Sequence, residues 1–210
     1  MLCLLLATRN AHKSREFSEL LGDEFQIRDL SGLEIPNLEE TGTNFEENAT
    51  LKAVTVSHQL LEISPCEGQP QYAIHTLVVA DDSGLEVDSL GGAPGVFSAR
   101  FAGENATDQA NLEKLLALLR GSTDRAARFQ CVIALASDGK LLGTFNGTAE
   151  GTIVEFPRGA GGFGYDPIFL PNGFDQTFGE MTPRLKNRIS HRAKAVAALR
   201  DFLQRNQIAR

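Results

Sequence analysis

The chain has 210 residues, enough for one sizeable core or for two lobes that share a sheet. Its net charge of −7 argues against general affinity for nucleic acid or for anionic membrane surfaces. No apolar run approaches the roughly 20 residues that cross a bilayer. Because Cys3, Cys66 and Cys131 lack the paired spacing of a disulfide framework or zinc site, we expect a soluble protein of the reducing cytoplasm.

The first apolar run, residues 2–7, predicts a core strand rather than a signal sequence, because no basic segment precedes it. A helix is expected from about residue 13 to residue 21, where apolar residues recur at helical spacing. Between them lies a polar loop that ends in Lys13. Backbone N–H groups at a helix N-terminus, together with a lysine, suit a phosphate group. The loop lacks the glycines of a Walker A motif.

The next helix is expected to begin in a capping box at Thr43 and Glu46 and to end near residue 61. The carboxylate pair Glu39-Glu40 precedes it, and alone such a pair is more often solvated surface than a ligand. Lys52 falls on or beside the apolar face of the helix. Two explanations stay open for it: the ammonium reaches water past an apolar stem, or it reaches an acidic or phosphate site.

The central stretch is a Val-rich run at residues 77–80, which predicts a buried strand that Gly84 stops. Asp81, Asp82 and Ser83 would then sit at a strand end, where open α/β sheets bind their ligands. Paired aspartates can hold a hard divalent cation, and one of them can orient a water. The same residues are also ordinary turn chemistry.

The remaining segments predict a mixed sheet rather than a plain parallel one. An excursion at residues 63–75 is assigned no function. The later elements are expected as a short strand at 85–88, a helix from Thr107-Asp108, a strand at 128–136, a hairpin at Asp138-Gly139, a return strand at 141–150, further pairing at 151–155, and a helix from Ser190 to about residue 203.

Two late segments indicate a ligand. The glycine-rich run at residues 159–164 lets the backbone approach a ligand closely, and beside it Phe163 and Tyr165 can stack on a base while Asp166 accepts from base or ribose donors. Residues 181–200 contain no acidic side chain. Their basic side chains indicate a small polyanion bound locally, and the cations at the start of the last helix oppose its macrodipole.

Taken together, these segments resemble the inosine triphosphate pyrophosphatase family. The resemblance covers nearly the whole chain in family order, and the ordered set is more specific than any one motif. The matching stretches are residues 6–13, 39–42, 45–49, 51–53, 80–85, 90–95, 161–167 and 189–192.

The resemblance implies an elongated, two-lobed α/β fold with a mixed β-sheet and flanking helices, formed by residues 1–210 as a single domain. The nucleotide would lie in a groove between the lobes. It also implies Mg²⁺-dependent hydrolysis of dITP, ITP and XTP to the monophosphate and pyrophosphate by a cytoplasmic homodimer.

Carried over by motif, Asp82 would be the proton acceptor and a metal ligand, Glu39 the second metal ligand, and Ser83 a substrate contact. The triphosphate would be held by Thr8, Arg9, Asn10, Ala11, His12 and Lys13, and the base and sugar by Phe163, Gly164, Tyr165, Asp166, Lys186, His191 and Arg192. The chain departs from the family at Arg9, where a small residue is usual, and in the length of the excursion at 63–75.

The chemistry of the residues agrees with this assignment. Arg192 offers only hydrogen-bond donors, which favour a 6-oxo purine over the 6-amino group of adenine. Two alternatives remain open. One is a related pyrophosphatase for modified pyrimidine nucleotides, and the other is a nucleotide-binding sensor without chemistry, against which Asp82, Glu39 and Lys13 argue because binding alone does not require them.

Overall fold

The computed structural model describes residues 2–36, 38–62 and 76–206. The excursion expected at residues 63–75, with Cys66, lies outside the described residues. Within the described ranges no helix combines the length and the apolar character needed to cross a membrane. The chain divides into two compact units, one made of residues 1–82, 132–146 and 195–210 (unit 1) and the other of residues 83–131 and 147–194 (unit 2).

Six strands form one mixed sheet in the order β2-β1-β3-β4-β5-β6. β1 runs parallel to β2 and to β3, whereas β5 and β6 are antiparallel, so the predicted mixed α/β class is confirmed. The elements are β1 (Leu2–Leu6), α1 (Ala11–Leu21), β2 (Phe25–Asp29), α2 (Phe45–Glu62), β3 (Leu77–Val87), α3 (Asp108–Leu118), β4 (Ala126–Ser137), β5 (Lys140–Ile153), β6 (Phe169–Pro171), α4 (Pro183–Ile189) and α5 (His191–Arg205).

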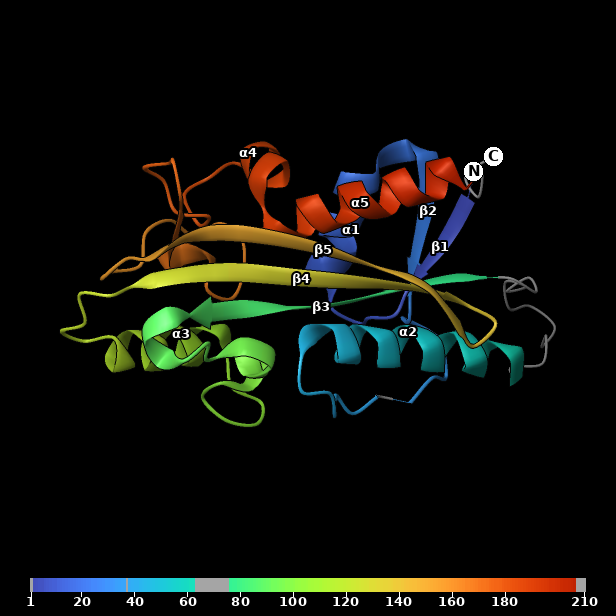
Figure 1. Cartoon of the computed structure of the whole chain (residues 1–210), viewed down its shortest axis with the longest axis horizontal. Helices are drawn as coiled ribbons and strands as arrows, with labels where there is room; N and C mark the ends of the chain where they lie inside the picture. The colour runs from blue at the N-terminus through green and yellow to red at the C-terminus, as the bar shows by residue number, and fades with distance from the viewer. Residues whose placement is uncertain (1, 37, 63–75, 207–210) are drawn as a thin grey trace. The chain divides into compact units, whose positions relative to one another are not determined.

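In unit 1, two parallel crossovers place helices on opposite faces of the sheet. The chain passes from β1 through α1 to β2, and then from β2 through α2 to β3 on the other side of β1. Because parallel crossovers are right-handed, steps in opposite directions along the sheet put α1 and α2 on opposite faces, as Figure 1 shows. The end of α5 lies beside α1, where Arg200 Nη2 donates to the carbonyl of Leu21 at 2.8 Å.

The central strand is longer than the sequence pattern predicts. β3 runs unbroken through the Asp81-Asp82-Ser83-Gly84 stretch to Val87, so Gly84 does not stop it and the short strand expected at 85–88 is its second half. The expectation that the two aspartates sit at a strand end was therefore wrong. Both are buried, at 3% and 5% exposure, and lysines pair with both, so their charges do not interrupt the strand.

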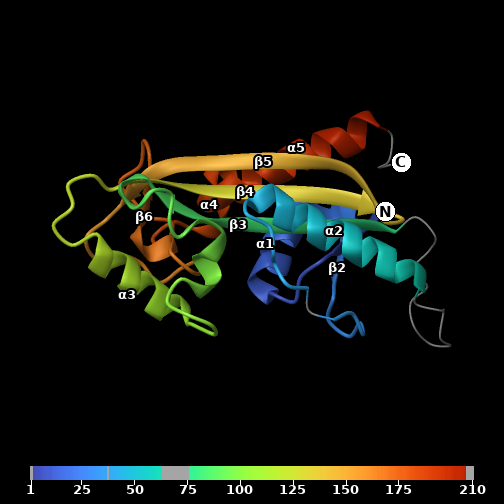
Figure 2. The same ribbon diagram turned by 60° about the horizontal axis from the view of Figure 1, so that its bottom comes forward.

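Unit 2 has a core of its own around the aromatic rings of Phe129, Phe169 and Phe178. The buried face of α3 supplies leucines to this core, as expected. Figure 2 shows α3 beside the turns that precede it in the chain. Asn111 on α3 joins the helix to these turns, because its amide accepts from the N–H of Ala102 at 2.7 Å and donates to the carbonyl of Ala99 at 3.0 Å.

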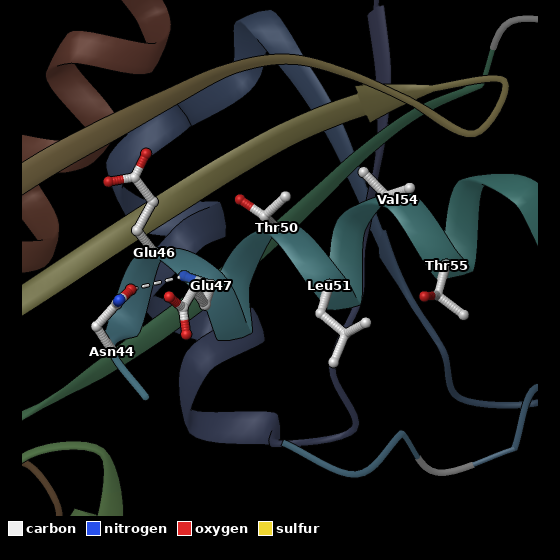
Figure 3. A pocket seen from close by; sticks show the side chains of 7 residues that line it. All are labelled: Asn44, Glu46, Glu47, Thr50, Leu51, Val54 and Thr55. Atoms are coloured by element: carbon white, nitrogen blue, oxygen red, sulfur yellow. Dashed lines mark hydrogen bonds between the residues drawn. The ribbon is translucent and has the colours of Figure 1, made fainter. Parts of the chain in front are cut away.

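The helices begin at side chains that cap their first N–H groups. One of these caps lies one residue from the position expected from the sequence, and one helix was not expected. The expected caps are confirmed at Thr107 and Ser190. α2 is capped by Asn44 rather than by Thr43, since Asn44 Oδ1 accepts from the N–H of Glu47 at 2.9 Å (Figure 3). α4 is not among the helices expected from the sequence; it begins at a Thr182 cap followed by a proline at its first position.

Candidate functional site

The two adjacent aspartates of β3 meet different helices of unit 1. Successive side chains of a strand point to opposite faces of a sheet. Asp81 pairs with Lys13 of α1, with 2.9 Å between Nζ and Oδ1. Asp82 pairs with Lys52 of α2, at 3.6 Å between Nζ and Oδ1. The aspartates therefore do not form one carboxylate pair, and each has its own surroundings.

The loop of residues 8–13 connects β1 to α1 and carries the predicted phosphate-binding residues. Asn10 caps the helix, because its Oδ1 accepts from the N–H groups of His12 at 2.9 Å and Lys13 at 3.3 Å. Thr8 Oγ1 in turn accepts from the N–H of Asn10 at 3.1 Å. A phosphate bound here would compete with the Asn10 side chain for the N–H groups of His12 and Lys13. The Lys13 ammonium already lies against Asp81.

On the other face of the sheet, Asp82 is surrounded by α2 and the loop before it. Lys52 lies 2.9 Å from Glu40 Oε1 and donates to the carbonyl of Asp81 at 2.8 Å. Asn48 Nδ2 donates to Asp82 Oδ2 at 3.0 Å. Of the two explanations for Lys52, contact with an acidic site is therefore confirmed. We call Asp82, Lys52, Glu40 and Asn48 the carboxylate–lysine cluster.

The cluster raises the pKa values of Asp82 and Lys52. Burial raises the pKa of Asp82, the Lys52 ammonium lowers it, and the Glu40 carboxylate raises it again, so the pKa ends above its ordinary value. Burial lowers the pKa of Lys52, but the charges of Asp82 and Glu40 outweigh burial and leave the pKa raised. Lys52 is therefore a fixed cation at neutral pH, beside a carboxylate that holds a proton more readily than usual.

The donor chemistry of this cluster fits Mg²⁺. This ion prefers carboxylate oxygens and is commonly held by one or two of them together with substrate phosphates. Asp82 and Glu40 both lie against the same ammonium, and Glu39, the predicted second ligand, is the exposed neighbour of Glu40. Among the residues described, no three His, Cys, Asp or Glu side chains converge on one point. A Mg²⁺ ion held by these carboxylates would therefore need further oxygen ligands, which the phosphate groups of a substrate would supply.

Arg9, the departure from the family pattern, reaches along the chain to the loop before α2. Its Nη2 donates to the carbonyl of Ile35 and, at 3.4 Å, to that of Leu33. Ile35 is itself buried, at 3% exposure. The arginine therefore joins the loop of residues 8–13 to the start of the segment that carries Glu39 and Glu40.

Replacing Arg9 by alanine is expected to loosen that segment. Losing these hydrogen bonds removes about 1 kcal/mol of local stabilisation, which corresponds to about fivefold more frequent opening. Glu-C protease, which cuts after glutamate, should then cleave at Glu34, Glu39 and Glu40 about fivefold faster in the nucleotide-free protein. Arg15→Ala, which removes the same charge from the exposed side of α1, is the control. Unchanged cleavage in Arg9→Ala would contradict this role.

In unit 2 a buried ion pair lies beside the glycine-rich run. Asp166 Oδ2 accepts from Lys186 Nζ at 2.7 Å and from the N–H of Phe163 at 2.9 Å. A Cβ at residue 162 would lie 1.9 Å from this oxygen, and Gly162 has φ of +72°, so glycine is required there on both counts. The Lys186 ammonium also lies 5.1 Å from the centre of the Phe163 ring.

The first turn of α5 contributes to the same group of side chains. Arg192, at 1% exposure, donates from Nη2 to Ser83 Oγ at 2.8 Å and has its guanidinium 5.7 Å from the Phe163 ring. His191 stacks on Phe129 with 4.7 Å between ring centres. The predicted residues Ser83, Phe163, Asp166, Lys186, His191 and Arg192 thus gather within unit 2. We call them the aromatic–basic cluster.

Tyr165 has a different environment from Phe163. It is 4% exposed, belongs to the core of unit 2, and donates its hydroxyl to the carbonyl of Ser98 at 2.9 Å. Burial raises the pKa of Tyr165, so the hydroxyl stays protonated and keeps this bond. Of the two rings expected to stack on a base, Phe163 is the one with exposed surface. The neighbouring Gly164 donates its N–H to Asp108 Oδ2 at 2.7 Å.

A hollow of about 620 Å³ on α2 lies apart from the predicted residues. Figure 3 shows the side chains that line it, from Asn44 just before the helix to Thr55 within it. Neither Asn48 nor Lys52 lines it. Its lining residues are Asn44, Glu46, Glu47, Thr50, Leu51, Val54 and Thr55. Since none of these is a predicted site residue, we do not assign the hollow to the site.

Glu40, Asn48 and Lys52 belong to the carboxylate–lysine cluster but were not among the site residues expected from the sequence. Lys52 gave a usable signal, because a lysine on an apolar helix face requires a partner. Glu40 lies beside Glu39 in the matching stretch at residues 39–42, and spacing alone does not tell which of two adjacent glutamates faces inward. Asn48 lies in the matching stretch at residues 45–49, but nothing in the local pattern indicates its contact with Asp82, which is 34 residues away in the sequence.

A family model, protein relatives and solved structures each match nearly the whole chain. The model of the Ham1 family matches residues 4–202. A dITP/XTP pyrophosphatase of Bacillus licheniformis is 46% identical over 204 residues, which cover 95% of this chain and 97% of the relative. The Bacillus subtilis protein of the same name is 44% identical, with coverage of 95% and 96%. The solved Ham1 protein of Staphylococcus aureus has a TM-score of 0.81 at 38% identity, covering 97% of this chain and 99% of the other.

Proposed function

Because the chain belongs to the Ham1 family and its relatives are named dITP/XTP pyrophosphatases, we propose that it hydrolyses the purine nucleotides dITP, ITP and XTP to the monophosphate and pyrophosphate. The enzyme class is that of a nucleoside triphosphate pyrophosphatase. The observation that carries the proposal is the carboxylate–lysine cluster, in which a buried carboxylate of raised pKa lies beside a fixed ammonium.

The proposed reaction is attack of water on the α-phosphorus. The new bond joins the water oxygen to this phosphorus, the bond to the bridging oxygen breaks, and pyrophosphate leaves with the electron pair. Asp82 takes the proton of the attacking water. In the protein without metal its raised pKa suits this role, because a base is most effective when its pKa is close to the working pH, and a bound Mg²⁺ would lower this pKa.

The triphosphate would be bound by unit 1. We assign Thr8, Asn10, Ala11, His12 and Lys13 to it, with the Lys13 and Lys52 ammonium groups countering its negative charge. Mg²⁺ would be held by Asp82 and Glu39, with Glu40 close by, and when bound it supplies charge neutralisation at the phosphate oxygens. Arg9 belongs to the same loop, and its guanidinium acts through the segment at residues 33–35.

The base and sugar would be read by the aromatic–basic cluster of unit 2. Phe163 offers a ring face for stacking, and Arg192 offers only donors, which match the 6-oxo group of hypoxanthine and xanthine. Against adenine these donors would face the donors of the 6-amino group, and an unpaired buried donor costs affinity. Ser83, Gly164, Tyr165, Asp166, Lys186 and His191 complete this assignment. We further propose that the protein acts as a cytoplasmic homodimer.

The experiment is pyrophosphate release from dITP, XTP, dATP, dGTP and methylated dTTP at equal concentration, with and without Mg²⁺. We expect Mg²⁺-dependent release from dITP and XTP alone. The donors of Arg192 account for the rejection of dATP only, because guanine also carries a 6-oxo group. Preferred hydrolysis of methylated dTTP would favour the pyrimidine alternative. Tight ITP binding without release would favour a sensor, and equal turnover of all the purine nucleotides would remove Arg192 from its role in base selection.

A further inference from the structure

The side chain of Asn48 connects Asp82, the proposed general base, to the loop of residues 39–43, which we call the acidic loop. It is fully buried, at 0% exposure, on the first turn of α2. Its Nδ2 donates to Asp82 Oδ2 at 3.0 Å, and its Oδ1 accepts from the N–H of Gly42 at 2.8 Å. Gly42 follows Glu39 and Glu40 in the same loop. One amide group thus contacts both β3, which carries Asp82, and the loop that carries Glu39 and Glu40.

The two partners require an amide in this orientation. A carboxylate oxygen can only accept a hydrogen bond and a backbone N–H can only donate one, so the connecting side chain must offer a donor and an acceptor at once. Turning the amide over would place its oxygen against the carboxylate and its NH₂ against the N–H. The orientation is therefore determined by the partners. A carboxylate or an aliphatic side chain at this position would leave at least one buried polar group without its hydrogen bond.

The loop reaches this position only because residue 42 has no side chain. A Cβ there would lie 2.6 Å from Asn48 Oδ1 and 2.7 Å from the Cβ of Glu47. The next residue is fastened as well, since Thr43 donates from its N–H and its hydroxyl to Glu47 Oε2, at 2.7 and 2.9 Å. The end of the acidic loop is thus held against α2 by close contact.

From this geometry we infer that Asn48 is a positioning residue for the reaction, and the inference rests on the proposed function. It holds Asp82 through Oδ2, which leaves Oδ1 on the side of Lys52. Through Gly42 it sets how far Glu40 lies from the same lysine. Its hydrogen bonds go to Asp82 and Gly42, and we assign it no contact with the substrate. It acts by keeping Asp82 and the acidic loop in one fixed arrangement.

The test replaces Asn48 by leucine, which has similar volume and no polar atoms. Partners that orient such a carboxylate set typically contribute 10- to 100-fold to activity or metal affinity. We expect kcat for dITP to fall about 10- to 100-fold while KM changes less than about threefold. In the nucleotide-free protein, the amide hydrogen of Gly42 should exchange faster, because its acceptor is gone.

Asn111→Leu is the matched control. Asn111 is buried at 2% exposure and, like Asn48, accepts one hydrogen bond and donates another, but here both partners are backbone groups, the N–H of Ala102 and the carbonyl of Ala99. It should lower the melting temperature to a similar extent and leave kcat and Gly42 exchange unchanged. Equal kcat in the two variants would overturn the inference.

Two further arms keep the test decisive. If Asn48→Leu does not fold, Gly42→Ala displaces the loop while Asn48 stays in place, and wild-type kcat in that variant would overturn the inference. If the wild-type protein releases no pyrophosphate from any nucleotide, the proposed function fails. The connection between Asn48 and the acidic loop is then tested by amide hydrogen exchange at Gly42 alone. Equal exchange rates in Asn48→Leu and Asn111→Leu would overturn it.

Discussion

Replacing Asp82 by asparagine is expected to lower kcat for dITP by about a thousandfold, since a positioned general base contributes roughly 10²- to 10⁴-fold. The amide has nearly the same shape but does not take a proton from water. Nucleotide binding measured without Mg²⁺ should change far less, because Lys13 and Lys52 keep their charges. The measurements are steady-state pyrophosphate release and the affinity for a dITP analogue that cannot be cleaved between the α- and β-phosphates.

The same variant should be no less stable than the wild-type protein without metal. Asp82 binds its proton more tightly when folded than when unfolded, where its pKa is near 3.8. Its contribution to the free energy of unfolding is therefore highest below pH 3.8 and falls as the pH rises through the raised folded pKa. Above that range the wild-type protein carries a charge that burial disfavours, and Asp82→Asn does not. Melting temperatures recorded across pH test this sign.

The control for the chemical change is Asp138→Asn at the turn between β4 and β5. This residue has φ of +51°, a conformation that asparagine adopts as readily as aspartate. It should keep wild-type turnover. If Asp82→Asn also keeps more than about a tenth of the wild-type kcat, Asp82 is not the general base.

The sequence predicted what depends on local pattern. The helix caps at Thr107 and Ser190, the turn at Asp138-Gly139 and the lysine on the apolar face of α2 follow from residues close to one another in the chain. For these features sequence neighbours and spatial neighbours are the same residues. The hairpin pattern also predicted that the sheet is mixed, the resemblance to a known family implied the α/β fold as a whole, and the structure and the comparisons confirm both.

What the sequence did not predict depends on partners far along the chain. Whether β3 ends at Gly84 is set by the strands beside it and by the lysines that neutralise Asp81 and Asp82. The role of Glu40 depends on Lys52, and Tyr165 became a core residue because Ser98 accepts its hydroxyl. None of these pairings leaves a periodic pattern.

Lys186→Met should lower stability more than most single changes in this chain. The Lys186–Asp166 pair is buried, with side chains 7% and 3% exposed. Removing one partner of such a pair costs about 3–5 kcal/mol, because the other charge stays buried without its counterion. At roughly 2–4 °C per kcal/mol for a chain of this size, the melting temperature should fall by roughly 10 °C. Turnover of dITP should fall as well, since the ammonium beside Phe163 is lost.

A second change separates stability from function. In Lys186→Met with Asp166→Asn, the uncompensated charge is gone, and the asparagine oxygen still accepts from the N–H of Phe163. The double variant should therefore regain most of the lost melting temperature. Activity should not return with it, because restoring neutrality to the core does not restore a cation to the nucleotide site. Joint recovery of stability and of dITP turnover would show that Lys186 supports the fold of unit 2 and does not read the substrate.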